Sequence, residues 1–165
     1  MKVTKPLTTV DIFSAPGGLS LGFSMAGFNP LIAVDFDKYG VETLIHNFSK
    51  TKVISADLRN LNGKEFLEKM IGDLGPINVL CGGPPCQGFS NIGRVKIASL
   101  VREGIWKLNN SHSRMIDDPR NLLYKEFVRL LNISKPLFFV MENVNGLASY
   151  FESFPLADGI PSECW

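Results

Sequence analysis

Short apolar runs alternate with segments of helical periodicity through residues 1–147, and this alternation constrains the fold more than any other feature. Strands that alternate with helices form parallel sheets joined by right-handed crossovers. Nearly continuous apolar runs are typical of strands covered on both faces. These runs are Thr9–Phe13, Leu31–Asp35, Lys52–Ser55, Asn78–Gly82 and Leu137–Glu142. The sequence therefore predicts an α/β fold with a Rossmann-like, doubly wound, mostly parallel sheet.

Helix signals lie between the predicted strands. Asp37 is a candidate N-cap, because apolar residues follow it at helical spacing. Gly27 is expected to end a helix that begins near Leu19. A further apolar stripe precedes Pro136, which cannot continue a helix, so that helix should end near Ser134. The stripe consists of Leu123, Phe127, Leu130 and Leu131, and a short helix is also expected over Gly63–Met70.

Two stretches break the alternation. Residues 87–118 show no strong period, and a connection of that length indicates a functional lid, an insertion or disorder. Their excess of basic over acidic side chains is modest. After Leu147 the pattern is lost, so we expect residues 148–165 to form an irregular tail beside a catalytic domain of residues 1–147.

Composition narrows the class of protein. Hydrophobic residues make up 45% and charged residues 20%, as in ordinary globular domains, and no apolar run approaches the length of a membrane span. The net charge of +1 does not by itself indicate nucleic-acid binding. The three cysteines include no Cys-x-x-Cys pair, which argues against a disulfide framework or a structural metal site and favours a reducing cytoplasm.

Three side chains mark the ends of successive predicted strands at equal intervals: Phe13, Asp35 and Asp57. Ligands of open parallel sheets bind outside the carboxyl ends of the strands. Gly17 and Gly18 allow a sharp turn and a close approach of the backbone to a ligand. Their spacing is not Gly-x-Gly-x-x-Gly, so the dinucleotide fingerprint is not matched.

These positions predict a nucleoside ligand. Asp35 can accept hydrogen bonds from both ribose hydroxyls, Asp57 can accept from an adenine amino group, and Phe36 can pack on the adenine ring. Each feature alone is explained as well by a turn or a helix cap, and only the combination favours a ligand. No phosphate-binding Gly-x-x-x-x-Gly-Lys motif is present, so a small or zwitterionic tail fits better than a triphosphate.

The fourth and fifth predicted strands lead to candidate reactive groups. Two glycines and two prolines precede Cys86 and impose a fixed course on the backbone, which a packed structural thiol does not need. Glu142 follows an apolar run, where desolvation would raise the pKa of its carboxyl group. A helix cap or an ion pair is the alternative for Glu142. If the two strands are neighbours, both groups should face one cleft.

These motifs resemble the cytosine-5 DNA methyltransferase family over about Val10 to Leu147. The similarity is carried by Pro84-Pro-Cys-Gln-Gly-Phe-Ser90 with Asn91-Ile-Gly-Arg94, by Glu142-Asn-Val144 and by Asp11-x-Phe-x-x-Pro-Gly-Gly18. Asp118-Pro-Arg-Asn-Leu-Leu123 resembles the segment that the family has between its two catalytic motifs. The cysteine motif is highly specific, whereas the glycine turn alone is weak.

The resemblance implies an S-adenosylmethionine-dependent methyltransferase fold and assigns roles. Cys86 matches the nucleophile and Glu142 the acid that contacts cytosine N3. The positions implied to line the S-adenosylmethionine site are Phe13, Ala15, Pro16, Gly17, Gly18, Asp35, Phe36, Asp57, Leu58, Gly83, Pro85 and Leu123. Those implied to meet the DNA or support the acid are Gln87, Ser90, Arg94, Lys96, Asn143 and Val144. The resemblance also implies that S-adenosylhomocysteine is a product and that no metal is needed.

The implied substrate is double-stranded DNA, and the implied setting is a prokaryotic cytoplasm, with restriction–modification as the family's usual context. An RNA cytosine methyltransferase is a less favoured alternative, because one branch of the family modifies tRNA. A cofactor-binding remnant without activity is another, and a nicotinamide dehydrogenase is a distant one. Residues 88–93 resemble the DNA branch more closely.

The sequence departs from the family in three ways. Ala15 stands where the family usually has glycine, Asp35 is shorter than the usual glutamate, and the loop after Arg94 is longer. The family also continues with an arginine motif, a target-recognition region and a final segment at the cofactor pocket, and residues 148–165 resemble none of them. We therefore expect an incomplete fold: a truncated gene product, an engineered fragment, or one subunit of a split enzyme whose second subunit carries target recognition. Alone, it should methylate DNA slowly or not at all.

Overall fold

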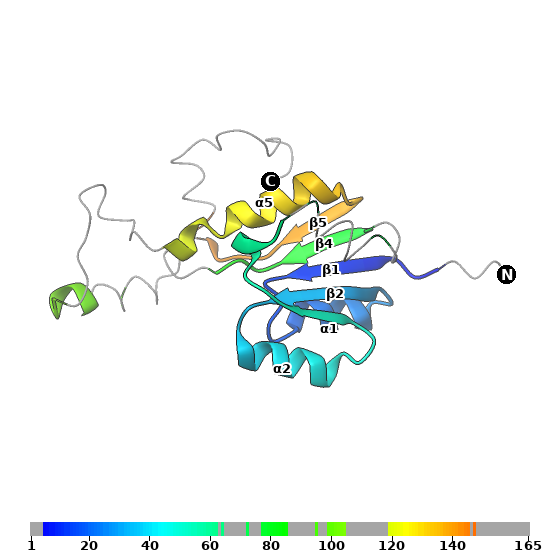
Figure 1. The fold of residues 1–165 in the computed structure, drawn as a ribbon, viewed down its shortest axis with the longest axis horizontal. Coiled ribbons are helices and arrows are strands. Elements are labelled where there is room, and N and C mark those ends of the chain that lie inside the picture. The colour runs from blue at the N-terminus through cyan, green and yellow to red at the C-terminus, as the bar shows by residue number, and fades with distance from the viewer. Residues whose placement is uncertain are drawn as a thin grey trace. The chain divides into compact units, whose positions relative to one another are not determined.

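A computed structural model describes residues 5–62, 64, 72, 77–85, 95, 99–104, 119–145 and 147 of the chain. The chain divides into two compact units, Met1–Pro84 with Arg129–Glu142, and Pro85–Val128 with Asn143–Trp165. Within the first unit lies a five-stranded sheet in the order β3-β2-β1-β4-β5, and every neighbouring pair is parallel. Figure 1 shows the labelled strands side by side with their arrowheads at the same end.

The five predicted strands are confirmed, with ends that move by a residue or two. They are β1 (Thr8–Ile12), β2 (Asn29–Asp35), β3 (Lys52–Ser55), β4 (Val79–Gly82) and β5 (Phe138–Met141). The strand order reverses beside β1, which pairs with β2 on one side and with β4 on the other. Doubly wound sheets bind ligands at such a reversal, outside the carboxyl ends of the strands.

Three helices follow the sequence signals: α1 (Gly18–Met25), α2 (Lys38–Asn47) and α5 (Tyr124–Ser134). Two short 3-10 helices, η1 (Leu58–Asn60) and η3 (Pro119–Leu122), were not predicted. The predicted cap is confirmed, since the Asp37 carboxylate accepts a hydrogen bond from Gly40 N. Gly27, with φ 86°, follows the end of α1. The helix expected over residues 63–70 lies, except for Lys64, outside the described residues.

The strand register sorts the side chains onto two faces. Asp11 of β1 lies opposite Ala33 of β2 and Cys81 of β4, so these three side chains share one face. Asp11 accepts hydrogen bonds from Ser20 of α1, which places α1 on that face. The alternate residues of the strands form an apolar core without measurable exposure: Val10, Ile12, Ile32, Val34 and Leu80.

None of the helices in the described part of the chain has the length and apolar character needed to cross a bilayer.

Candidate functional site

The connection from β1 to α1 turns abruptly at the carboxyl end of the sheet. Phe13 adopts a positive φ of 57°, which non-glycine residues seldom adopt, and Ser14 N donates to Val34 O at 3.1 Å. Gly17 has a φ of 111°, and a Cβ there would lie 2.6 Å from Cε2 of Phe48. Both the backbone angle and the packing therefore require glycine at position 17.

Asp35 joins two loops at this edge. Its Oδ2 accepts from Ala15 N and its Oδ1 from Asp37 N, both at 2.9 Å. One carboxylate therefore holds the β1–α1 turn and the start of α2 in fixed positions. A carboxylate oxygen has two lone-pair directions, so each oxygen keeps one acceptor site for a ligand.

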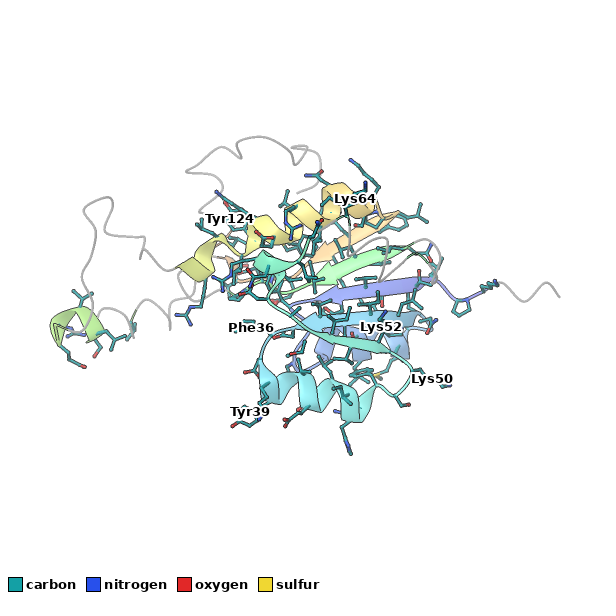
Figure 2. The ribbon with its side chains drawn as sticks, viewed as in Figure 1. Phe36, Tyr39, Lys50, Lys52, Lys64 and Tyr124 are labelled. Carbon is teal, nitrogen blue, oxygen red and sulfur yellow. The ribbon has the colours of Figure 1, made fainter. Side chains whose placement is uncertain are left out.

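Phe36 and Tyr39 leave apolar surface beside this carboxylate. Phe36 is 60% exposed and Tyr39 75% exposed, so the described residues leave most of the surface of both rings uncovered. Figure 2 shows Phe36 beyond the end of β2 and Tyr39 on the first turn of α2. The exposed ring of Phe36 agrees with a position at which a flat ligand group could stack.

The first turn of α1 is open. A Cβ built at Gly18 meets no atom within 4 Å, so packing does not demand glycine there. The hydroxyl of Ser14 is buried and has no hydrogen-bond partner among the described residues. An open helix N-terminus with an unpaired polar atom in the preceding turn fits a small polar ligand group.

The methyl group of Ala15 packs against α2. A Cβ built at Gly40 would lie 2.3 Å from Cβ of Ala15, so Gly40 leaves the space that Ala15 occupies. The methyl group that distinguishes Ala15 from the family's usual glycine therefore packs within the protein, which the sequence did not reveal.

Asp57 and Leu58 lie after β3. Asp57 caps η1 by accepting from Arg59 N at 3.0 Å, and the guanidinium of Arg59 pairs with the same carboxylate. The Arg59 hydrogen bonds lower the pKa of Asp57. Leu58 is buried, and its carbonyl accepts from Nη2 of Arg129 at 2.9 Å. Asp57 is thus both a helix cap and an ion-pair partner, and Arg59 contacts both of its carboxylate oxygens.

The ends of β4 and β5 meet at Gly82, Gly83 and Glu142. Glu142 N donates to Gly82 O at 2.9 Å, and a Cβ at Gly83 would lie 3.2 Å from Oε2 of Glu142. β4 and β5 are neighbours, which fulfils one condition for Cys86 and Glu142 to face one cleft. The expected burial of the Glu142 carboxyl was wrong, because its side chain is exposed. The apolar strand ends at Met141, and the carboxyl lies beyond it.

The other candidate residues lie outside the described residues or in the second unit. Cys86, Gln87, Ser90, Arg94 and Lys96 fall outside the described residues. In the second unit, Pro85 is half-buried, Leu123 is buried, and the amide oxygen of Asn143 accepts from Val144 N at 2.9 Å. Among the described residues, no group of histidine, cysteine and acidic side chains could hold a metal ion.

Sequence reasoning missed Asp11 as a site residue. It is fully buried in β1, and its Oδ2 accepts from both Oγ of Ser20 at 2.7 Å and N of Ser20 at 3.1 Å. Burial raises the pKa of Asp11 to about 6. A charged residue in the middle of an otherwise apolar strand was the available signal.

Comparisons with known proteins agree on one family. The sequence profile described as "C-5 cytosine-specific DNA methylase" matches residues 7–153. The Type II methyltransferase M1.HphI of Haemophilus parahaemolyticus is 38% identical over 144 residues, which cover 87% of this chain and 34% of that protein. The Type II methyltransferase M.AquIA of Picosynechococcus sp. is 35% identical over 141 residues, which cover 86% of this chain and 50% of that protein.

Solved structures give the same fold. A protein assigned as a DNA modification methyltransferase and encoded within an E. coli prophage superposes with a TM-score of 0.66 at 34% identity, over 89% of this chain and 35% of that one. DNMT2 of Spodoptera frugiperda matches with a TM-score of 0.55 over 87% of this chain and 37% of that one, and at 18% identity this supports the fold alone. The sheet is that of a Rossmann-like methyltransferase.

The chain spans about a third to a half of the length of the curated relatives it matches. Since the profile nevertheless covers most of the chain, from residue 7 to residue 153, the chain belongs to the C-5 cytosine-specific DNA methylase family.

Proposed function

We propose that this chain supplies the S-adenosylmethionine-binding and thiol-bearing part of a DNA cytosine-5 methyltransferase. The observation that carries the proposal is the open turn between β1 and α1, which Asp35 holds in place by its hydrogen bond to Ala15 N. This turn lies at the carboxyl ends of the strands, beside the reversal in strand order. Family membership gives the turn its ligand class.

The residues of the first unit fit the cofactor that the family generally uses. Asp35 retains acceptor sites for two ribose hydroxyls, and Phe36 offers an exposed ring for adenine. The open first turn at Gly18 leaves backbone N–H groups for the carboxylate of the amino-acid tail. Phe13, Ala15, Pro16, Gly17, Asp57, Leu58 and Gly83 complete the proposed lining within this unit. When bound, S-adenosylmethionine supplies an electrophilic methyl group.

The proposed chemistry starts from a weak nucleophile, because C5 of cytosine does not attack a methyl donor unaided. Addition of the Cys86 thiolate to C6 moves electron density onto C5. Protonation or hydrogen bonding at N3 by Glu142 makes that addition easier. After C5 has been methylated, loss of its proton and elimination of the thiolate restore the ring.

Glu142 must be protonated, or at least donate a hydrogen bond, for this role. Its carboxyl is exposed, so a neutral acid requires that the bound base removes water from around it. The glycine at position 83 leaves room beside Oε2, because a side chain there would come within 3.2 Å. An exposed acid next to an unfilled position suits a group that becomes desolvated only when the base arrives.

The target base must leave the duplex, because stacking shields C6. We assign the closing segment to residues 87–118, with Gln87 and Ser90 near the base and Arg94 and Lys96 near phosphates. Asn143 and Val144 would support the acid. Because the chain covers only part of its relatives, we place target recognition in further polypeptide, either continuous with this chain or carried by a second subunit. Residues 1–147 remain the proposed catalytic domain.

Trapping with 5-fluorocytosine tests the proposal. Fluorine at C5 prevents the final proton loss, so duplex DNA carrying this base should form a persistent adduct with Cys86 when S-adenosylmethionine is present. The Cys86→Ser variant is the matched control, and tRNA carrying 5-fluorocytosine tests the alternative substrate. The reaction is run with this chain alone and with the remaining polypeptide of a relative. Failure to trap Cys86 under both conditions would contradict the proposal, and trapping on tRNA alone would transfer it to RNA.

A further inference from the structure

Asp11 is a buried carboxyl group that the proposed reaction does not use. It lies in β1, and Ala33 and Cys81 lie opposite it on the neighbouring strands. Its side chain has no measurable exposure. Acidic side chains are almost never buried in this way unless they are paired, so the partners of Asp11 should explain its presence.

Two hydrogen bonds to Asp11 come from one residue at the start of α1. Oδ2 of Asp11 accepts from Ser20 N at 3.1 Å and from Ser20 Oγ at 2.7 Å. The N-cap residue of α1 is Gly17, which makes no side-chain hydrogen bond to the helix. An N-cap side chain normally serves the N–H of the second or third helical residue, and Ser20 is the third residue of α1. Asp11 therefore gives α1, from a neighbouring strand, the cap that glycine cannot provide.

We propose that Asp11 is a positioning residue, which caps α1 through Ser20 and thereby holds the Gly17–Gly18 turn ready for the cofactor. Position 17 must be glycine, since a side chain there would collide with Phe48, and Gly18 leaves the first turn of the helix open. A cap supplied by a side chain of β1 holds the helix in place and leaves the space at Gly18 open. The identity of the ligand rests on the proposed function, but the capping role does not.

The ionised form of Asp11 lowers the stability of the fold, and this predicts how the free energy of unfolding changes with pH. Desolvation by burial raises the pKa of Asp11 from 3.8 to about 6, although the Ser20 hydrogen bonds act in the opposite direction. The other titratable groups acting on Asp11 are Cys81 of β4 and Asp35 at the end of β2. Because the folded pKa exceeds the unfolded one, the stability of the fold decreases as pH rises from about 4 to above 6.

No cation of the described residues pairs with Asp11, and its further polar neighbour is the thiol of Cys81. Burial also raises the pKa of the Cys81 thiol well above its ordinary range, so that neighbour stays neutral. A buried carboxylate that lowers stability and lacks a counter-ion is expected where its charge serves a site. Here the charge strengthens the hydrogen bonds to the helix N-terminus.

The Asp11→Asn variant separates a positioning role from a merely structural one. The amide oxygen can still accept from Ser20, but without the charge the cap weakens. At pH 8 we expect global stability to be unchanged or higher, because the burial cost of the charge is gone. We expect faster hydrogen exchange at Ser20 and Leu21, and S-adenosylhomocysteine affinity lower by about 10-fold. A structural role would lower stability and affinity together.

Thr9→Val is the matched control. Thr9 is also buried in β1, lies two positions from Asp11 on the same face, and its hydroxyl has no partner among the described residues. Its substitution should leave both the Ser20 exchange rate and the affinity for S-adenosylhomocysteine unchanged.

A pH titration completes the test. In the wild-type chain the amide resonance of Ser20 should shift with a midpoint near pH 6 and the affinity should fall below it, whereas Asp11→Asn should show neither change. Unaltered Ser20 protection together with unaltered affinity in Asp11→Asn would overturn the proposal.

If wild type fails to bind S-adenosylhomocysteine, the proposed function fails and the Ser20 resonance and exchange rate decide the capping role. If Asp11→Asn does not fold, Ser20→Ala takes its place, and wild-type protection of Leu21 in that variant would count against the proposal.

Discussion

The carboxyl ends of β1 and β2 differ from those of β4 and β5. At the first pair, Asp35 and Asp37 each bind backbone N–H groups, so the loops are fixed before any ligand arrives. At the second pair, Glu142 is exposed beside Gly83, and its backbone N–H is the part held by the sheet. The contrast suits the proposed division of labour, because a cofactor site gains from preorganisation whereas an acid that meets an extruded base must remain accessible.

The two ends share one seam, where Gly82 of β4 lies beside Ile12 of β1. A Cβ at Gly82 would lie 2.1 Å from the carbonyl oxygen of Ile12, and that oxygen belongs to backbone that cannot rotate away. The preorganised end and the accessible end therefore depend on the same glycine. Disturbing it should affect both ends at once.

The largest effect is expected from Gly82→Ala, which forces β4 away from β1. We predict a loss of about 4 kcal/mol in the free energy of unfolding, or failure to fold, because the clash involves backbone on both sides. Urea denaturation measures it. Gly22→Ala is the control, since a Cβ there meets nothing within 4 Å and alanine favours a helix interior by about 0.5–1 kcal/mol. Wild-type stability in Gly82→Ala would show that the seam is not the common support.

Glu142→Gln sharpens the comparison at the accessible end. An exposed side chain contributes little to stability, so the unfolding free energy should stay within about 0.5 kcal/mol of wild type. Methyl transfer to DNA should nevertheless fall by about 10²-fold, because glutamine cannot deliver a proton to N3. Initial rates are measured with the polypeptide that completes the enzyme. Glu42→Gln on the exposed surface of α2 should change neither quantity, and an unimpaired Glu142→Gln enzyme would remove the acid from the mechanism.

The sequence predicted the strands and the helix cap because each of them depends on residues that are close together in the chain. The five strands and the Asp37 cap follow from apolar runs and from a capping residue beside its helix. The match of Ala15 to Gly40 could not be predicted, because it joins a turn to a helix far along the chain. The exposure of Glu142 could not be predicted either, because the hydrophobicity of a strand does not determine what covers the residue that follows it.

The places of the candidate residues in the fold were more predictable than their contacts. Strand ends placed Asp35 at the sheet edge, but its two backbone partners depend on how two loops converge there. Asp11 is evident in the sequence as a charged residue inside an apolar strand. Its proposed capping role could not be predicted, because it depends on the contact of β1 with Ser20 of α1. Periodicity identifies which residues face inward, and only the tertiary fold shows which of them meet.

The smallest predicted effect separates two neighbouring carboxylates. Asp35→Asn retains one acceptor oxygen, but its NH₂ group must face either Ala15 N–H or Asp37 N–H, so two donors oppose each other. We predict a loss of about 1–3 kcal/mol in the free energy of unfolding and a matching loss of cofactor affinity.

Asp37→Asn is the control, because Asp37 accepts from one N–H, that of Gly40, and asparagine caps a helix about as well as aspartate. Thermal unfolding and calorimetric titration with S-adenosylhomocysteine compare the two variants. If Asp37→Asn lost as much as Asp35→Asn, removal of one negative charge from this edge would explain both results. The two-loop anchorage at Asp35, on which the preorganised end depends, would then have no energetic support. A loss confined to Asp35→Asn would instead assign the preorganisation to the geometry of that carboxylate, because the two substitutions change the charge equally.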